Sequence, residues 1–523
     1  MRNCHFALVI ACSVFLLCGL NAFATNTYYI DYGAGSNSNN GTSKTIPWKT
    51  HPYMQAAAAC TGSGSAPRYT HSAGDIFIFK QGSSWPNACF DMKIMSGGTS
   101  STPDQYTYDP TWGTAGGTTG NTGQAVGVYQ FTAGGSVIKG ADGFNKFIDI
   151  AANYVTINGL EMTGMTWTGS GGAYGNVIMV NLETSQYVIV SNCYAHGWTH
   201  SGATSDVLVV VYADVASPYN PGSRMTGCVI DGANSGGSRV ADSGSATYAL
   251  QNADNNIIRN MTNGLIVGYN STVHDNLIGP INQSFDAGMH ENCIEPIGMG
   301  TNYFYNNVWH DCTAVGILTQ GGAPSSVAEI DYLWNNVAYV GSVSSPPIPF
   351  QFDSVSTNMA GSAVYAYNNT IYSGAGVCMR TVNRGNGNIG TIDLRNNHCI
   401  TANGTFIAPG VTGNTHINAN NLVDTSATNY NSPPSGNPPP RAYSPSSSSA
   451  DTIGYGQNLS SIATGSLATL ADVTTYGGYG PVTSRGGSSC TPTPGTPGCW
   501  DAGAYLFGSI GPPPPTGLQA AVH

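Results

Sequence analysis

A recurring pair of asparagines is the feature that most restricts what this chain can fold into. The dipeptide Asn-Asn begins at positions 306, 335, 368, 396 and 420, so the pairs recur at a similar but variable spacing. Each pair follows an aromatic or β-prone run, as in YFYNNVW and YLWNNVA. A constant local context at variable spacing predicts structural coils of one kind that carry loops of different length.

Each coil would supply short parallel strands that pair only with the coils on either side of it. Asparagine suits the corner of such a coil because it tolerates left-handed backbone angles, and stacked Asn amides can hydrogen-bond along the axis. Between about residues 130 and 425, β-rich runs alternate with Gly, Asn and Ser, and no long amphipathic helix fits. The sequence therefore predicts an all-β solenoid, a parallel β-helix, with about nine or ten coils.

Charged residues are scarce, which excludes several other classes of protein. They make up 8% of the 523 residues, against roughly 25% in an ordinary globular domain, so a coiled coil is excluded. The formal net charge is −11 and only 16 residues are Lys or Arg. Because no basic patch can neutralise a phosphate backbone, we expect no nucleic-acid partner.

The N-terminal segment, residues 1–24, predicts export. Arg2 precedes an apolar run from Phe6 to Leu20, and Ala22-Phe23-Ala24 supplies a small-residue cleavage site. No later stretch reaches the ~18 to 20 apolar residues that a spanning helix needs, so no membrane span is expected. The protein is expected to be secreted, either extracellular or periplasmic.

Removal of residues 1–24 would leave ten cysteines, an even number that predicts disulfides in an oxidising compartment. No pair has CxxC spacing, which disfavours a thiolate zinc site. Connectivity cannot be deduced from the sequence, but neighbours in sequence order would each close a modest loop: Cys60/Cys89, Cys193/Cys228, Cys293/Cys312, Cys378/Cys399 and Cys490/Cys499.

The ends of the chain differ from its middle. Residues 25–130 are predicted to form an N-terminal cap and the first coils, with a short helix near Tyr53 to Cys60, a strand and turn at 74–85, and a loop-rich insertion at about 96–127. The β-helix would occupy 131–430 and a Pro/Ser-rich linker 431–450. A closing segment at 451–510 and a Pro-rich tail at 511–523 would complete the chain.

Several of these segments resemble the secreted right-handed parallel β-helix proteins of the pectate-lyase-like superfamily. The resemblance rests on YYIDYGAGSNSNNGTSKTIPWKT, GDIFIFKQGSSW, NYVTINGLEMTG, YFYNNVWHD and WDAGAYLFG, and it covers about residues 26 to 508. It implies a right-handed coil and a polysaccharide, often an acidic one, bound along an outer face. The motifs of polygalacturonase-like hydrolases, pectin methylesterases and pectate lyases are missing, so no catalytic residue is carried over.

Ionisable residues concentrate in one stretch, which runs from His274 to Asp311. If YNSTVHD and YNNVWHD occupy equivalent places in adjacent coils, Asp275 lies over Asp311, and His274 over His310, at the ~4.8 Å strand spacing. Carboxylates that close could bind a cation, so Asp275 and Asp311 form a candidate Ca²⁺ site. The residues of this stretch are His274, Asp275, Asp286, His290, Glu291, Glu295, His310 and Asp311.

Two enzymatic interpretations of this stretch remain open. A glycoside hydrolase needs two carboxyl groups, for which Asp275, Glu291, Glu295 and Asp311 are candidates. A lyase needs a base, such as His290 or His310, and a cation, such as Arg259 or bound Ca²⁺, to stabilise the charge that develops.

Strand alternation places Glu291 and Glu295 on one face, with His290 and Asn292 on the other.

Tyr305, Trp309 and Trp334 are candidates for stacking against sugar rings, although alternation puts part of the aromatic set inside the core. The competing class is a non-catalytic extracellular structural or adhesive β-helix protein.

Overall fold

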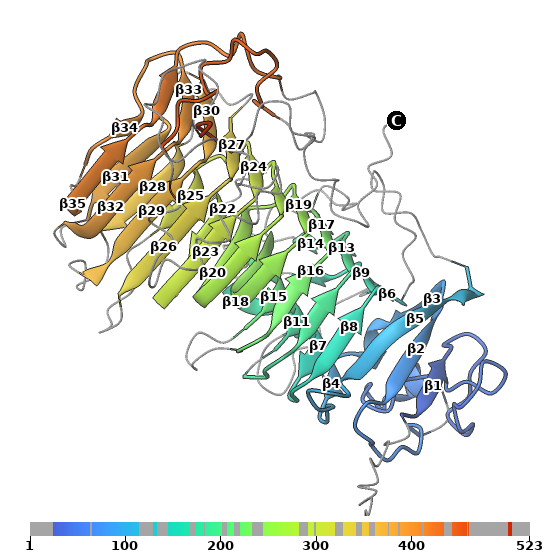
Figure 1. The fold of residues 1–523 in the computed structure, drawn as a ribbon. Coiled ribbons are helices and arrows are strands. Elements are labelled where there is room, and N and C mark those ends of the chain that lie inside the picture. The colour runs from blue at the N-terminus through green and yellow to red at the C-terminus, as the bar shows by residue number, and fades with distance from the viewer. Residues whose placement is uncertain are drawn as a thin grey trace, which may run out of the picture.

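In a computed structural model of the chain, three parallel faces wind into one elongated β-helix (Figure 1). All ladders between its named strands are parallel, and one face has ten strands, in agreement with the predicted number of coils. The structure describes residues 25–62, 65–114, 129–132, 145–167, 174–182, 184–200, 207–213, 220–232, 244–281, 291–297, 300–319, 328–340, 348–354, 361–374, 376–384, 388–410, 413–432, 442–457, 459 and 500–504.

We name the faces A, B and C in the order in which each coil visits them. Two long strands, β18 (Gly244–Asp254) and β20 (Asn263–His274), belong to face A in their first half and to face B in their second. The other strands of face A are β4 (Met92–Ile94), β7 (Asn145–Ile150), β11 (Tyr174–Asn181), β15 (Val207–Tyr212), β22 (Asn292–Pro296), β25 (Val315–Thr319), β28 (Ile348–Ser354), β31 (Met379–Asn383) and β34 (Ile407–Ala408).

Face B begins in the N-terminal cap and runs the length of the solenoid. Its other strands are β1 (Thr27–Ile30), β2 (Ile76–Gln81), β5 (Asp104–Gly113), β8 (Val155–Asn158), β12 (Ile189–Ser191), β16 (Arg224–Thr226), β23 (Gly300–Tyr305), β26 (Glu329–Trp334), β29 (Ala363–Tyr367), β32 (Ile389–Arg395) and β35 (Gly413–Ala419). Face C consists of β9 (Glu161–Thr163), β13 (Tyr194–His196), β17 (Val229–Asp231), β19 (Ile257–Arg259), β21 (Leu277–Ile278), β24 (Val308–His310), β27 (Val337–Tyr339), β30 (Thr370–Gly374), β33 (His398–Thr401) and β36 (Leu422–Asp424).

The corner between faces B and C confirms the predicted role of the asparagine pairs. The first residue of each pair is left-handed, as at Asn335 with a φ of 54°. The second points inward and bonds to its counterpart in the next coil: Asn307 Nδ2 donates to Asn336 Oδ1 at 3.1 Å. This internal ladder consists of Asn256, Asn276, Asn307, Asn336, Asn369, Asn397 and Asn421.

The N-terminal cap differs from the prediction in two places. Helix α1 covers only Ala58–Thr61, because most of the segment from Tyr53 is turn and extended chain. Strand β5 passes through the segment expected to be a loop-rich insertion, because buried Tyr106 pairs in register with Phe77 of β2. The remaining cap elements are β3 (Ser83–Pro86), the 3-10 turn η1 (Asn87–Cys89) and β6 (Tyr129–Thr132), while β10 (Thr166–Trp167) and β14 (Thr199–His200) form a separate pair.

The described part of the C-terminal region folds back onto the solenoid. Tyr443, in the segment predicted to be a linker, stacks on Tyr372 of face C with ring centroids 4.5 Å apart. Leu459 and Trp500 pack against the aromatic side chains of face B. Residues 442–450 therefore lie against the coils, whereas the signal segment and the Pro-rich tail lie outside the described residues.

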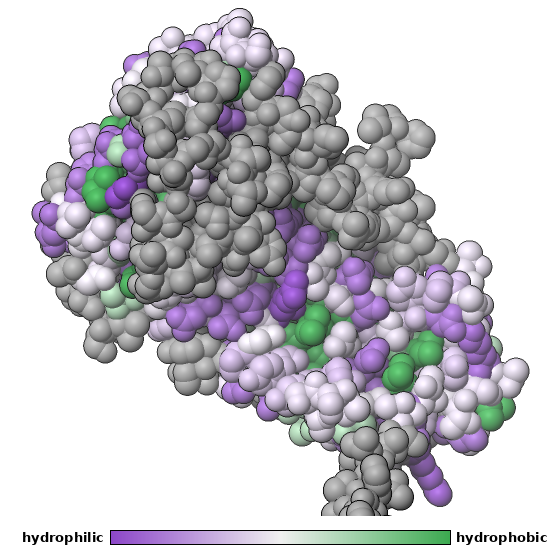
Figure 2. All heavy atoms as spheres, in the orientation of Figure 1, coloured by the Kyte–Doolittle hydropathy of each residue, from purple (hydrophilic) through white to green (hydrophobic). Residues whose placement is uncertain are grey.

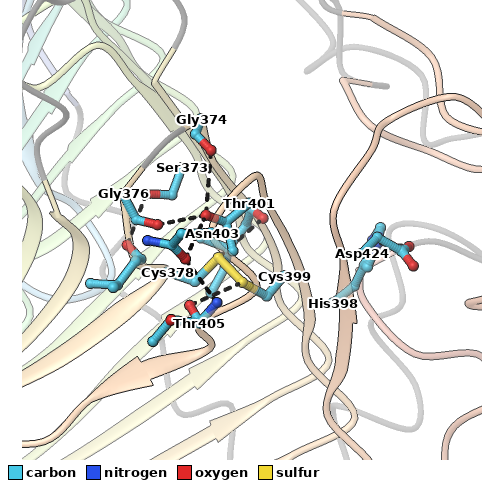
Figure 3. Close-up of a disulfide and its surroundings, with 12 residues drawn as sticks. Ser373, Gly374, Gly376, Cys378, His398, Cys399, Thr401, Asn403, Thr405 and Asp424 are labelled. Atoms are coloured by element: carbon cyan, nitrogen blue, oxygen red, sulfur yellow. Dashed lines mark hydrogen bonds and ion pairs between the residues drawn. A yellow bond between two sulfur atoms is a disulfide. The ribbon is translucent and has the colours of Figure 1, made fainter.

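Three of the five expected disulfides form: Cys60–Cys89, Cys293–Cys312 and Cys378–Cys399. In Figure 3, Cys378–Cys399 lies beside a turn in which Thr401 Oγ1 donates to backbone carbonyls of the preceding coil. The predicted Cys490–Cys499 pair lies outside the described residues. Among the helices of the described segments, none is both long and apolar enough to cross a membrane.

The predicted Cys193–Cys228 disulfide is wrong, because both side chains are buried free thiols. They occupy the inner corner position in adjacent coils, where the Cys193 N–H donates to Cys228 Sγ at 3.4 Å. Side chains in register on parallel strands stay ~4.8 Å apart, whereas bridged Cβ atoms lie ~3.5 to 4.5 Å apart. The two sulfurs instead extend the asparagine ladder, since the Cys228 N–H donates to Asn256 Oδ1 at 2.9 Å.

Candidate functional site

The predicted ionisable cluster is divided among the three faces. His274 and Asp275 lie at the end of face B, and His310 and Asp311 at the end of face C. Glu295 lies on face A, where Glu291 immediately precedes β22. Asp286 and His290 lie outside the described residues.

The predicted alignment of the two His-Asp pairs is wrong because the asparagine ladder sets a different register. Asn276 pairs with Asn307, so that His274 lies beside Tyr305. Asp275 and Asp311 therefore occupy different corners of the coil and do not form the expected Ca²⁺ site. No group of three or more His, Cys, Asp or Glu side chains suited to a metal ion is found in the described part of the chain.

The aromatic candidates do not present a stacking platform. Trp309 points into the core and is 1% exposed, and Trp334 is 2% exposed in the cluster that includes Trp500. Tyr305 stacks on His274 at 4.7 Å and on Trp334 at 4.6 Å, so both faces of its ring are covered. A sugar could contact only the edge of this ring.

The candidates on face C are buried. Arg259 Nε donates to Asp231 Oδ2 at 2.8 Å, and the Arg259 residue is 6% exposed. His310 Nδ1 is 2.9 Å from Asp311 Oδ2, and its ring stacks on Tyr339. With 5% of His310 exposed, this dyad packs within the protein rather than facing a substrate.

The two glutamates near face A are also buried, at 7% and 6% exposure for Glu291 and Glu295. Asn292 Nδ2 donates to Glu295 Oε2 at 3.0 Å. This bond joins two side chains that strict alternation placed on opposite faces. Burial, and then the nearby charge of Glu295, raise the pKa of Tyr248.

His274 and Asp275 form the dyad that is open to solvent. His274 Nδ1 is 2.7 Å from Asp275 Oδ2, and the two side chains are 22% and 35% exposed. The left-handed φ of 54° at Asp275 marks the point where the chain turns from face B to face C. A carboxylate that accepts Nδ1–H leaves Nε2 as the basic nitrogen, and Nε2 has no partner within the described residues.

An ion pair in the two preceding coils of face B completes the site. Asp254 aligns with His274, and Arg224 donates through Nε and Nη2 to both oxygens of Asp254. Burial alone would raise the pKa of Asp254, but bonds from Arg224, Thr226 and Asn255 lower it, so the carboxylate stays charged. The Arg224 side chain is 44% exposed and presents its positive charge to solvent.

Sequence reasoning missed Arg224 and Asp254, although a signal was present. TGC at 226–228, DNN at 254–256 and HDN at 274–276 are the same corner in successive coils. Aligning these corners would have placed Thr226, Asp254 and His274 in one outward column.

This site combines an oriented base with an exposed guanidinium on a polar surface. The strands that carry it lie side by side in the middle of Figure 1. In Figure 2, the described surface on this side is mostly purple and white, with only small separate green areas. The arrangement suits proton abstraction next to a carboxylate better than the binding of an apolar ligand.

Comparisons with known proteins give only distant similarities. No family model matches, and no curated protein matches. A GH136 lacto-N-biosidase from Eubacterium ramulus is 12% identical, with a TM-score of 0.45 over 76% of this chain and 68% of that one. An alginate lyase from Paenibacillus sp. str. FPU-7 is 14% identical, with a TM-score of 0.31 over 71% of this chain and 96% of that one. A rhamnogalacturonan lyase is 14% identical, with a TM-score of 0.37 over 78% and 91%. Similarity at this level identifies neither activity nor site residues.

Proposed function

We propose that this chain is a secreted polysaccharide lyase that acts on a uronate-containing glycan, with His274 as the base. The observation that carries the proposal is the His274–Asp275 dyad, whose Nδ1 is held at 2.7 Å while Nε2 is left without a partner among the described residues. The alternating polar groups along face B suit an extended sugar chain better than a compact ligand.

The reaction would be a β-elimination. His274 Nε2 takes the proton from the ring carbon that bears the uronate carboxylate. Arg224 pairs with that carboxylate and stabilises the negative charge that spreads onto it. The bond to the glycosidic oxygen at the neighbouring carbon then breaks, a carbon–carbon double bond forms, and the leaving oxygen receives a proton from His274 or water.

A hydrolase mechanism fits these residues less well. It needs one carboxylic acid that can donate a proton and a second carboxylate. Asp254 has a lowered pKa and two occupied oxygens, so it is a poor proton donor, and Asp275 is committed to His274. A purely structural β-helix would not need an exposed dyad that is open at Nε2.

The first experiment is a panel of acidic and neutral polysaccharides incubated with the purified mature chain, with and without a chelator. We expect unsaturated products, read by ultraviolet absorbance, together with new reducing ends from a uronate polymer. Reducing ends without unsaturation would establish hydrolysis instead. Retention on a glycan without any cleavage would favour the structural class. Loss of activity with chelator that added Ca²⁺ restores would establish a calcium requirement.

The second experiment separates catalysis from packing at His274. His274→Phe keeps a ring that can stack on Tyr305 but removes the base, so turnover should fall by about 10²- to 10⁴-fold without loss of thermal stability. His416→Ala is the matched control, because this histidine is exposed on β35 of the same face. Full activity in the Phe variant would remove His274 from the mechanism.

Asp275 and Arg224 provide two further tests of the same site. Asp275→Asn should lower turnover and alter its pH profile, because the amide no longer holds the imidazole in one tautomer. Arg224→Lys keeps the charge but loses the bidentate bond to Asp254 that orients it, so turnover should fall because the developing charge is stabilised less well. Secretion is tested by detecting the chain without residues 1–24 outside the cytoplasm, as the three disulfides among the described residues suggest.

A further inference from the structure

A polar cleft opens in the N-terminal cap, away from the His274 site. It occupies about 490 Å³, within the ~300 to 1,000 Å³ of typical ligand pockets. The cleft lies where β1, β2 and β5 end, and Asp31, Tyr32, Lys80, Ser83 and Ser84 contribute side chains to its wall. These strands appear at the N-terminal end of the molecule in Figure 1.

Asp31 and Lys80 form the fixed polar centre of this cleft. Asp31 Oδ1 accepts the Gly33 N–H at 2.9 Å, and Oδ2 accepts from Lys80 Nζ at 2.7 Å. Burial alone would raise the pKa of Asp31, but Lys80 and the backbone donors lower it, so the carboxylate stays charged. The Asp31 side chain is 4% exposed and that of Lys80 is 31% exposed, so the lysine presents its remaining donors to the cleft.

Two glycines keep part of the wall free of side chains. Gly82 has a φ of 75°, and a Cβ there would lie 2.6 Å from the Thr114 carbonyl oxygen. Gly113 has a φ of 90°, and a Cβ there would lie 2.3 Å from the Gln81 carbonyl oxygen. Both positions require glycine, because the backbone is left-handed and a carbonyl oxygen of the neighbouring segment lies too close for a Cβ atom. The ends of β2 and β5 can therefore lie close together, and neither glycine places a side chain in the cleft.

A polar column on the outer side of face B runs from β5, whose C-terminal end lines the cleft, to the His274 site. Asn158 Nδ2 donates to Thr107 Oγ1 at 3.0 Å, and Ser191 Oγ donates to Asn158 Oδ1 at 3.0 Å. By strand register the column continues through Thr226 to Asp254 and His274. The six strand spacings from β2 to β20 amount to roughly 29 Å.

We propose that the cap cleft is a non-catalytic binding site for a neutral sugar unit, and that it holds one part of a glycan whose chain follows face B to His274. Adjacent hydroxyls of a sugar each donate and accept. The Lys80 ammonium group offers donors to them and the Ser83 oxygen offers an acceptor, while buried Asp31 holds both side chains in place. The charges of Asp31 and Lys80 cancel, so the cleft favours a neutral polyol over a phosphate or a uronate. The path along face B rests on the proposed function, whereas binding in the cleft does not.

The test is calorimetric titration of the full mature His274→Phe chain with neutral xylo-, manno- and cello-hexasaccharides. The double variant Asp31→Asn/Lys80→Met removes both charges without leaving either one unpaired, and should weaken binding of the best hexasaccharide at least tenfold. Ser83→Ala should weaken it less, because the hydroxyl donates to Asp31 at 3.3 Å and offers the sugar only an acceptor. Lys44→Met is the matched control, since this lysine pairs with Asp109 and is not among the residues that line the cleft.

Three results would overturn the proposal. They are the absence of binding to every neutral hexasaccharide at millimolar concentration, unchanged affinity for them in the double variant, or a double variant that weakens binding of inorganic phosphate or galacturonate oligomers more than binding of the neutral ones. In a chain with His274 intact, the double variant should raise KM for the polymer and leave turnover at saturation unchanged. Should His274→Phe remain active while the cleft binds sugar, the catalytic proposal alone would fail.

Discussion

A carboxyl group inside the solenoid should contribute to the stability of this protein a term that falls as the pH rises. Asp331 of β26 is 1% exposed and points inward between Glu329 and Leu333, with Asn302 Nδ2 donating to its Oδ1 at 2.9 Å. Burial raises the pKa of Asp331 to about 7, although bonds with Asn302 and Glu329 act in the opposite direction. The folded protein therefore keeps a proton there at mildly acidic pH.

The sign and size of the effect follow from the difference between the folded and unfolded states. The pKa of Asp331 is about 7 in the fold against 3.8 for the ordinary group. Between those values the folded state binds more protons than the unfolded state, so the free energy of unfolding falls as the pH rises, by up to about 1.4 kcal/mol per pH unit. The total loss is on the order of 4 kcal/mol, complete slightly above pH ~7.

Asp331→Asn removes this ionisation and keeps an oxygen that accepts from Asn302. We expect the variant to match the wild type near pH 4 and to exceed it at pH 8 by a few kcal/mol, measured by guanidinium unfolding followed through tryptophan fluorescence. Asp109→Asn is the control, because Lys44 and Thr111 hold the pKa of partly buried Asp109 at about 2, and its loss should add no slope between pH 4 and 8. The same change of stability with pH in the wild type and in the Asp331→Asn variant would refute the reasoning, because only the difference between the two isolates Asp331 from other buried groups such as His51.

Two further predictions concern the internal ladder. Asn336→Ala removes four hydrogen bonds, and should cost about 3 kcal/mol or more in chemical unfolding; Asn335→Gly, at the left-handed corner, should change stability by less than about 1 kcal/mol. Equal losses in the two variants would contradict the assigned roles. Cys193 and Cys228 are buried free thiols, so an alkylating reagent should modify them once the protein is unfolded, even when no reductant is added. Peptide mass spectrometry reads the modification, and recovery of a disulfide-linked peptide that contains both residues would disprove the free-thiol assignment.

The coil architecture could be predicted because one residue type meets two requirements at the corner. Asn tolerates the left-handed backbone at the first position, and its amide bonds along the axis at the second. The repeated Asn-Asn pairs are therefore visible in the sequence from Asn306 to Asn421. Short strands in register with their neighbours then follow from the constant two-residue corner.

The candidate site was less predictable, because the coils that carry it have other residues than Asn-Asn at the corner between faces B and C. Asp275 and Asn276 replace an Asn-Asn pair there, so matching the identical letters His-Asp joined two different corners. The burial of Trp334 depends on Trp500, which is distant in the sequence, and no local pattern reports such docking. Of the candidates, His274 and Asp275 lie together and open to solvent, and Tyr305 packs against them.

The contacts along the polar column of face B distinguish His274 from its neighbours Asp254 and Tyr305 as the candidate base. Asp254 is saturated by Arg224 and Thr226, and Tyr305 is stacked on both sides, so each neighbour of the histidine already has its contacts. Stacking alone would be satisfied by any planar ring at position 274, and the Asp275 carboxylate would then have no nitrogen to orient. The combination of a filled column, an oriented imidazole and an open Nε2 is what a base requires and what packing does not. The register of the coils, which the inner asparagine amides set, therefore decides which ionisable residues lie side by side and can act together.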